Sequence, residues 1–300
     1  MDRKFILTCE STVDVPYAHW EERDIPVLFY KYVVNGQEYI DDMDRTPGAR
    51  EQFYKFIAEG DIPKTSQINQ YTYGEFFEEQ LKKGQDLMHI CLGTGMTLAY
   101  NNAVVAAEEL KEKYPDRKIV VIDSYCSSSG YGLLVDYAAD MADEGKSIEE
   151  VEEWINENRF KVHHQFYAVD LQYYKRTGRM SGPTATLAAV LNICPIMRLD
   201  RTGHIIAYSK VRGRDKAIKA TIDWMEEHAQ GGLDYCGKLW ISHSERYEDA
   251  VETKKQLAER FKKVNPDDIQ IYDIGTIIAS HCGPGTLAIF FMGDERPEKI

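Results

Sequence analysis

Hydroxyl and imidazole side chains stand at points of the chain where runs of apolar residues are interrupted. Thr65 and Ser66 precede a predicted helix, and Thr97 follows the glycine loop Gly93–Gly95. His281 stands just before a predicted strand. Together with the N–H groups of loop backbone, such side chains can donate hydrogen bonds to a bound anion. For Thr65 and Ser66 taken alone, capping of the following helix is the commoner role.

The glycine loop favours a small anion over a nucleotide. It lies between a predicted strand and a predicted helix, so the backbone amides around Gly95 face the carboxyl edge of the sheet, where α/β proteins bind their ligands. Leu98 occupies the place of the third glycine in a dinucleotide-binding fingerprint. The segment therefore does not match a nucleotide site.

Two further loops carry cationic or titratable side chains next to glycines. Arg176 and Arg179 stand in one of them, where a guanidinium group can bind a carboxylate or phosphate through two parallel hydrogen bonds. Surface salt bridges are the commoner fate of such residues. In the other, the rigid turn Gly283–Gly285 fixes the direction of His281, although most lone histidines are structural.

Strands and helices that could position these loops alternate over the first 160 residues, as in parallel α/β sheets. The expected strands are Phe5–Cys9, Asp86–Leu92 and Lys118–Ile122. Helical spacing of apolar residues predicts helices at Tyr71–Lys83, Leu98–Tyr114 and Gly130–Asp143. Asn35-Gly36 predicts the turn of a β-hairpin outside the parallel sheet.

The pattern changes after a helix expected at Ser147–Asn158, because Pro195–Leu199 and His204–Ser209 predict an antiparallel pair. The remaining expected elements are helices at Gly213–His228 and Tyr247–Lys263 and strands at Lys238–Ser242, Ile269–Ile274 and Thr286–Met292. We therefore expect an α/β protein of two domains. Residues 1–160 form a parallel, Rossmann-like domain, residues 161–300 form a mixed or antiparallel α/β domain, and the ligand site lies between them.

The net charge of the chain disfavours binding to anionic partners. The chain has 36 Lys and Arg against 49 Asp and Glu residues, a formal net charge of −13. Such a chain repels phosphate backbones and anionic lipid headgroups, so we expect no nucleic acid partner and at most transient membrane contact.

The six cysteines are scattered and form no Cys-x-x-Cys pair. The sequence therefore assigns no metal site and no cofactor. Cys91 and Cys194 lie in apolar runs, where free thiols pack as small apolar groups in a reducing compartment. The apolar run at the N-terminus is too short for a signal peptide. These features predict a cytoplasmic protein.

Taken in order along the chain, the motifs resemble the DegV family of bacterial fatty-acid-binding proteins. The resemblance covers nearly the whole chain, and the order and spacing of its segments carry it rather than any one of them. The segments are Glu10–Asp14, Thr65–Gln67, Val121–Ser124, Thr177–Ser181, Leu191–Ile196, Lys210–Arg214 and His281–Gly285.

The resemblance implies a non-enzymatic carrier that buries one long-chain fatty acid between its domains. A separate fatty acid kinase would phosphorylate the presented carboxylate, giving an acyl phosphate for phospholipid synthesis. Transferred by position, the ligand-binding residues are Thr65, Ser66, Gly95, Thr97, Arg179, His281 and Gly283. Arg179 would lie at the mouth of the site, where its charge assists phosphoryl transfer or orients the head group.

Physical chemistry supports this division between tail and head group. A buried acyl chain gains roughly 0.8 kcal/mol per methylene, or roughly 11 kcal/mol for fourteen of them before ordering costs. An ionised carboxylate is costly to bury unless several donors surround it. The tail is expected among Thr184–Ile193 and Thr286–Phe291, two segments that ordinary core packing explains equally well.

Two features depart from the family pattern. Thr97-Leu98 stands where Ser-Gly is usual, and Glu10 and Ile68 replace an aspartate and a proline. The β-branch of Thr97 and the loss of a glycine beside the head group allow a different acyl class or another small carboxylate ligand.

Two alternatives of other classes stay open. An acyl-ester hydrolase would use Ser124 and His281 with Asp123, although the chain has neither a Gly-x-Ser-x-Gly elbow nor a His-Glu-x-x-His motif. A basic patch could dock an acidic protein partner, although a solvated surface is the default interpretation. The patch consists of Arg201, Lys210, Arg212, Arg214, Lys216 and Lys219.

Overall fold

The computed structural model describes residues 3–180 and 192–298 of the chain. A parallel sheet in strand order β2-β1-β6-β7 forms the centre of the N-terminal half. Its strands are β1 (Phe5–Glu10), β2 (Val27–Leu28), β6 (Asp86–Cys91) and β7 (Ile119–Asp123). All of β1 and nearly all of β6 are buried, as expected for parallel strands covered on both faces.

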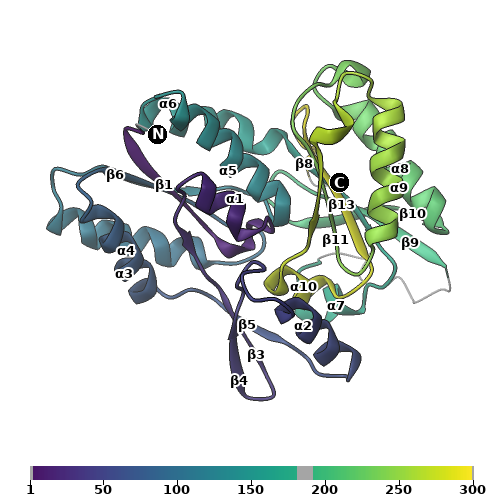
Figure 1. Ribbon diagram of the computed structural model, residues 1–300, viewed down its shortest axis with the longest axis horizontal. Helices are drawn as coiled ribbons and strands as arrows, with labels where there is room; N and C mark the ends of the chain where they lie inside the picture. Colours follow the sequence, from purple (N-terminus) through teal and green to yellow (C-terminus); the bar gives the residue numbers. More distant parts are fainter. Residues whose placement is uncertain (1–2, 181–191, 299–300) are drawn as a thin grey trace.

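Helices cover this sheet on both sides. In Figure 1, α3 and α4 lie below β1 and β6, whereas α6 lies above them and α1 and α5 lie to their right. Their bounds are α1 (Tyr17–Glu22), α3 (Gln70–Leu81), α4 (Ala99–Lys113), α5 (Ser128–Asp143) and α6 (Ile148–Asn158). Helix α5 is buried along most of its length because it packs against β1 and also against strands of the C-terminal half. In the described ranges, none of the helices has the length and apolar character needed to cross a membrane.

A small antiparallel sheet in the order β4-β3-β5 extends below the parallel one. It consists of β3 (Lys31–Val34), β4 (Gln37–Ile40) and β5 (Lys64–Ser66), with α2 (Ala49–Ala58) between the last two in sequence. The predicted hairpin turn is confirmed, since Asn35 and Gly36 both have positive φ angles, 51° and 80°.

The C-terminal half is built on a six-stranded sheet in the order β10-β9-β8-β13-β11-β12. Only β11 and β12 pair in parallel; the other neighbours are antiparallel. The strands are β8 (Val162–Ala168), β9 (Ile193–Leu199), β10 (Ile205–Arg212), β11 (Leu239–His243), β12 (Ile269–Asp273) and β13 (Thr286–Met292). The helices are α7 (Gln172–Thr177), α8 (Arg214–His228), α9 (Tyr247–Arg260) and α10 (Thr276–Cys282).

Within residues 3–180 and 192–298, four short 3₁₀ turns accompany these helices. They are η1 (Ser11–Val13), η2 (Arg159–Lys161), η4 (Gly232–Asp234) and η5 (Pro266–Asp268).

The predicted fold class is confirmed, with a parallel sheet followed by a mixed one. Every assigned strand up to residue 123 belongs to the first two sheets, and every assigned strand from residue 162 on belongs to the third. This division supports the proposal of a domain boundary near residue 160.

Two local predictions were wrong. His281 is not in a turn before a strand but in the last turn of α10. Thr65 and Ser66 are not a helix-capping loop, because they lie in β5 and pair with β3. The cap of α3 is Asn69, whose side chain accepts a hydrogen bond from the N–H of Thr72.

Candidate functional site

A cavity lies where the N-terminal and C-terminal halves of the chain meet. It contains about 910 Å³ of space free of protein atoms, part of which is open to solvent. Most of its lining is apolar and comes from both halves: Leu92, Met96, Phe166, Leu199, Ile205, Ile274, Ile277, Ile278, Ala288 and Phe290. An apolar lining with a few polar groups is typical of a site for an apolar small molecule.

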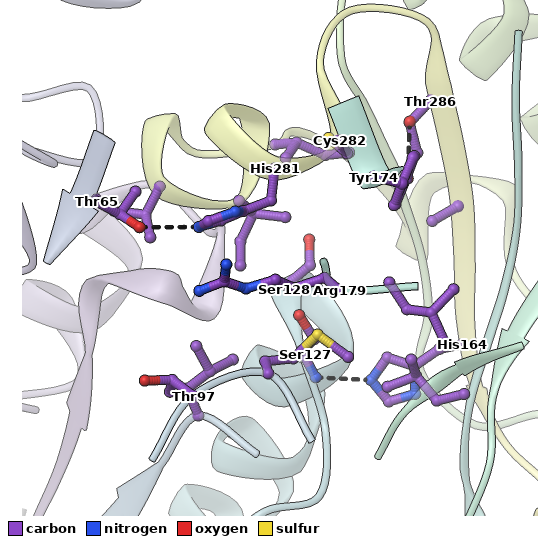
Figure 2. A pocket seen from close by; sticks show the side chains of 18 of the residues that line it. Thr65, Thr97, Ser127, Ser128, His164, Tyr174, Arg179, His281, Cys282 and Thr286 are labelled. Carbon is purple, nitrogen blue, oxygen red and sulfur yellow. Dashed lines mark hydrogen bonds between the residues drawn. The ribbon is translucent and has the colours of Figure 1, made fainter. Parts of the chain in front are cut away.

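Thr65 and His281 meet at one side of this cavity (Figure 2). Oγ1 of Thr65 lies 2.9 Å from Nε2 of His281. Strand β5 carries Thr65 and is held by pairing with Tyr32 of β3. Helix α10 carries His281 and is anchored at its start by Asp41, which accepts hydrogen bonds from the N–H (3.1 Å) and hydroxyl (2.8 Å) of Thr276. A carboxylate of the first half thus fixes a helix of the second.

His281 is uncharged at neutral pH. Burial lowers the pKa of His281 to about 4, and the nearby positive charge of Arg179 acts in the same direction. Its Nδ1 is buried and has no hydrogen-bond partner among the described residues. Since a neutral imidazole can use both nitrogens in hydrogen bonds, the pair with Thr65 has unused hydrogen-bonding capacity.

Arg179 supplies a positive charge at the same side of the cavity. Helix α7 ends at Thr177, and Gly178, with a φ of 69°, turns the chain back so that Nη1 of Arg179 donates to the Thr177 carbonyl at 2.5 Å. Burial lowers the pKa of Arg179, and no acidic group of the described ranges opposes that shift. A half-buried guanidinium without an acidic partner favours an anionic ligand.

Thr97 offers a further donor. Its Oγ1 accepts a hydrogen bond from the N–H of Ala99 at 3.3 Å, which leaves the hydroxyl hydrogen available to a ligand. The neighbouring Leu98 is 57% exposed and does not line the cavity. In Figure 2 the guanidinium of Arg179 lies between the Thr65–His281 pair and Thr97. Three kinds of donor therefore face one region of the cavity.

His164 lies on the opposite side of the view from Thr65 (Figure 2). Its pKa is lowered well below the usual value, first by burial and then by the charge of Arg296. Nε2 accepts a hydrogen bond from the N–H of Ser127 at 3.1 Å, so Nδ1 carries the hydrogen and donates to the Val162 carbonyl at 3.0 Å. With both nitrogens engaged, His164 contributes mainly ring surface to the cavity.

Five of the seven residues expected from the sequence line this cavity: Thr65, Ser66, Thr97, Arg179 and His281. Their contact with a ligand stays a prediction. Of the segments expected to hold the tail, β13 contributes Thr286, Ala288 and Phe290, which alternate toward the cavity. Most of the other segment, residues 184–191, lies outside the described residues.

Gly95 and Gly283 are not among the lining residues, and close packing explains both glycines. A Cβ on Gly95 would lie 2.3 Å from the backbone of Gly203, so the missing side chain lets the two halves approach. Gly283 has a φ of 67°, donates its N–H to the Ala279 carbonyl at 2.8 Å and packs against the ring of Tyr173. The structure thus gives each glycine a structural role.

Several polar lining residues were not expected from the sequence, among them Tyr30, His164 and Tyr174. The pair His163-His164 in the apolar run of β8 was an available signal, since consecutive residues of a buried strand face opposite sides.

Asp123, Ser124 and His281 do not form a hydrolase triad. Oγ of Ser124 lies 3.0 Å from the N–H nitrogen of Cys126 and is buried. Asp123 accepts hydrogen bonds from the N–H and hydroxyl of Thr94, at 3.1 and 2.5 Å. Because each side chain is engaged elsewhere, these described residues give no support to the hydrolase interpretation.

The basic patch is partly neutralised. Three of its six residues form ion pairs with acidic neighbours: Arg201–Glu295, Arg214–Asp249 and Lys219–Asp223. Ion pairing reduces the positive charge that these residues could offer to an acidic protein partner. Docking of a partner at the basic patch stays a prediction.

Known proteins share both the sequence pattern and the fold. A sequence model of the DegV family, described as "Uncharacterised protein, DegV family", matches residues 4–294. The chain belongs to the DegV family. Among curated DegV relatives, a DegV domain-containing protein of Clostridium perfringens is 36% identical over 297 residues, or 98% of this chain and 99% of the relative.

Solved DegV structures superpose over almost the whole chain. A DegV lipid-binding protein of Thermotoga maritima has 27% identity and a TM-score of 0.82, covering 98% of this chain and 99% of its own. A second T. maritima protein, described as revealing a fatty acid binding function, has 27% identity and a TM-score of 0.81, covering 97% and 99%. A fatty acid binding DegV protein of Streptococcus agalactiae has 25% identity and a TM-score of 0.81, covering 99% and 100%.

Proposed function

We propose that this DegV protein binds a long-chain fatty acid in the cavity between its halves. The observation that carries the proposal is Arg179, a half-buried cation without an acidic partner in the described ranges, beside a cavity with a mostly apolar lining. The lipid and fatty acid binding of relatives with 27% identity supports the same ligand class.

In this proposal the carboxylate lies among Arg179, Thr97 and the Thr65–His281 pair. Arg179 and Thr97 donate to its oxygens, and a charge-assisted hydrogen bond contributes about twice as much as a neutral one. The acyl chain extends along Phe166, Leu199 and Phe290. Each buried methylene contributes about 0.8 kcal/mol, so the tail supplies affinity and the head-group residues supply orientation.

Mass spectrometry of ligand extracted from natively purified protein tests this function. We expect one dominant class of long-chain fatty acid at a stoichiometry approaching one per chain. Absence of any acyl ligand, together with no uptake of added fatty acid, would contradict the proposal. Multiple turnover of an acyl ester by the isolated protein would contradict its role as a carrier.

We further propose that a separate cytoplasmic fatty acid kinase acts on the bound lipid. In that reaction a carboxylate oxygen attacks the γ-phosphorus of a nucleoside triphosphate, forming the acyl phosphate and releasing the nucleoside diphosphate. Ser124 and Asp123 are engaged in hydrogen bonds with Cys126 and Thr94, which supports the proposal that this chain supplies no catalytic residue. Acyl phosphate should form only when kinase, nucleotide and loaded carrier are combined. Equal turnover by the Arg212→Glu variant would remove the basic patch as the docking surface.

A further inference from the structure

Glu10, His89 and Cys91 form a buried cluster, and none of the three is among the residues that line the cavity. One ligand atom from each of the three lies within 4.8 Å of the other two. All three side chains are completely buried. A carboxylate, an imidazole and a thiol are the three side-chain types that zinc prefers.

Strand geometry brings the three residues together. β1 and β6 pair in parallel with Thr8 beside His89, and alternate residues of a strand share a face. Thr8 and Glu10 therefore project on the same side as His89 and Cys91. Aromatic rings of α3 surround the cluster, since the ring centroid of Phe77 lies 5.0 Å from that of His89.

The hydrogen bonds of Thr8 direct a lone pair of His89 into the cluster. Oγ1 of Thr8 lies 3.2 Å from the Met88 carbonyl and 2.8 Å from Nδ1 of His89. If the hydroxyl donates to the carbonyl, it accepts from Nδ1–H, and Nε2 then carries a lone pair. Nε2 has no hydrogen-bond partner among the described residues and faces Oε1 of Glu10 at 3.5 Å.

Two electron-rich atoms facing each other in a dry core are unfavourable unless a cation lies between them. In tetrahedral zinc with bonds of about 2.0 Å, coordinating nitrogen and oxygen atoms are about 3.3 Å apart, close to the observed 3.5 Å. Ionised Glu10, thiolate Cys91 and neutral His89 would also balance the two positive charges of the ion.

We propose that Glu10, His89 and Cys91 bind a zinc ion inside the N-terminal domain. The ion replaces the thiol hydrogen of Cys91, which leaves as a proton, so that a sulfur–zinc bond forms without any change of oxidation state. A water or hydroxyl oxygen occupies the fourth position. The site is structural, and it borders the cavity through Glu10, whose Oε2 accepts a hydrogen bond from the N–H of Leu92 at 2.9 Å.

Metal analysis of protein produced in minimal medium tests this site. With zinc supplied, wild-type protein should retain about one zinc per chain after dialysis against chelator. With cobalt in place of zinc, the protein should show a near-ultraviolet sulfur-to-cobalt charge-transfer band. His89→Gln and Cys91→Ser should each lose most of the bound metal. Cys91→Ser should also lose the charge-transfer band, because it lacks the sulfur ligand.

Cys9→Ser is the matched control, because Cys9 lies on the same strand as Glu10, is equally buried and projects from the opposite face. It should retain the metal. Wild-type protein without zinc and without a cobalt band would overturn the proposal. Equal metal content in wild type and folded His89→Gln would overturn it as well. Because the readout is metal and not lipid, this result is independent of fatty acid binding.

Discussion

At the scale of single residues, several hydrogen-bond donors of the cavity were predicted from the sequence. Thr65, Thr97, Arg179 and His281, which all line the cavity, were expected because their hydroxyl, guanidinium and imidazole groups interrupt apolar runs of the sequence. His164 could not be found in this way, because its place depends on β8 pairing with β13, a contact between distant segments. The side-chain type identifies a donor, whereas only the fold decides which donors meet.

Replacing Thr65 by valine keeps the β-branched shape and removes the hydroxyl that lies 2.9 Å from Nε2 of His281. We expect fatty acid affinity to fall about fivefold to tenfold, the usual effect of one lost hydrogen bond. Titration calorimetry with a delipidated protein measures it. Thr65→Ser, which restores the hydroxyl, should bind nearly as the wild type does; equal affinity of Thr65→Val and wild type would place the head group elsewhere.

Replacing Arg179 by glutamine removes the positive charge from the cavity. Affinity for a fatty acid should fall by about tenfold or more, because a charge-assisted hydrogen bond is lost. Affinity for the fatty alcohol of the same length should change little. Arg176→Gln is the control, since Arg176 is exposed and lies over the ring of Tyr173, 4.6 Å from its centroid. Parallel losses for acid and alcohol would assign Arg179 to the tail or to packing.

At the scale of elements, long periodic segments were predicted well and short ones were not. Helix α10 was missed because Thr276, Ile277 and Ile278 are β-branched, which lowers helix propensity and obscures a seven-residue helix. Strand β5 has only three residues, too few to show an alternating pattern. Both elements are fixed by contacts with distant segments, and both carry head-group residues.

The anchor of α10 predicts a pH-dependent stability. Burial raises the pKa of Asp41 to about 6, although hydrogen bonds from Ser11 and Thr276 oppose the shift. In the unfolded chain an aspartate has a pKa of about 3.9. The folded state therefore binds the proton more tightly, and this contribution to stability is fully present below about pH 4 and is lost as the pH rises through about 6.

Asp41→Asn keeps an acceptor for Thr276 and cannot ionise. Between pH 5 and pH 7.5 the wild type should lose about 1.4 kcal/mol of unfolding free energy relative to the variant. Urea unfolding at both pH values measures this difference. Identical pH dependence of the two proteins would show that Asp41 does not titrate in this range.

At the scale of the whole molecule, alternation of strands and helices was enough to predict the two kinds of sheet and a cavity between them. The contacts that join the halves were not predictable, because each pairs residues distant in the sequence. The N–H of Ser127 donates to His164 at 3.1 Å, and Nη2 of Arg296 donates to the Tyr125 carbonyl at 2.9 Å. The close approach of Gly95 to Gly203 likewise joins residues that are distant in the sequence.

Since both halves line the cavity, a bound lipid should stabilise them as one unit. The unfolding temperature of delipidated protein should rise when fatty acid is added. The size of the rise depends on the ratio of ligand concentration to dissociation constant. Differential scanning calorimetry measures the shift. An unchanged transition at saturating fatty acid would show that the cavity is not the binding site.

A crystal structure of the delipidated protein with a fatty acid carrying bromine at its terminal carbon tests the central claim most directly. The account predicts carboxylate density within hydrogen-bond distance of Arg179 and Thr97. It also predicts an anomalous bromine peak in the apolar part of the cavity, near Leu199 or Phe290. Bromine beside Arg179, or lipid bound anywhere outside this cavity, would contradict it.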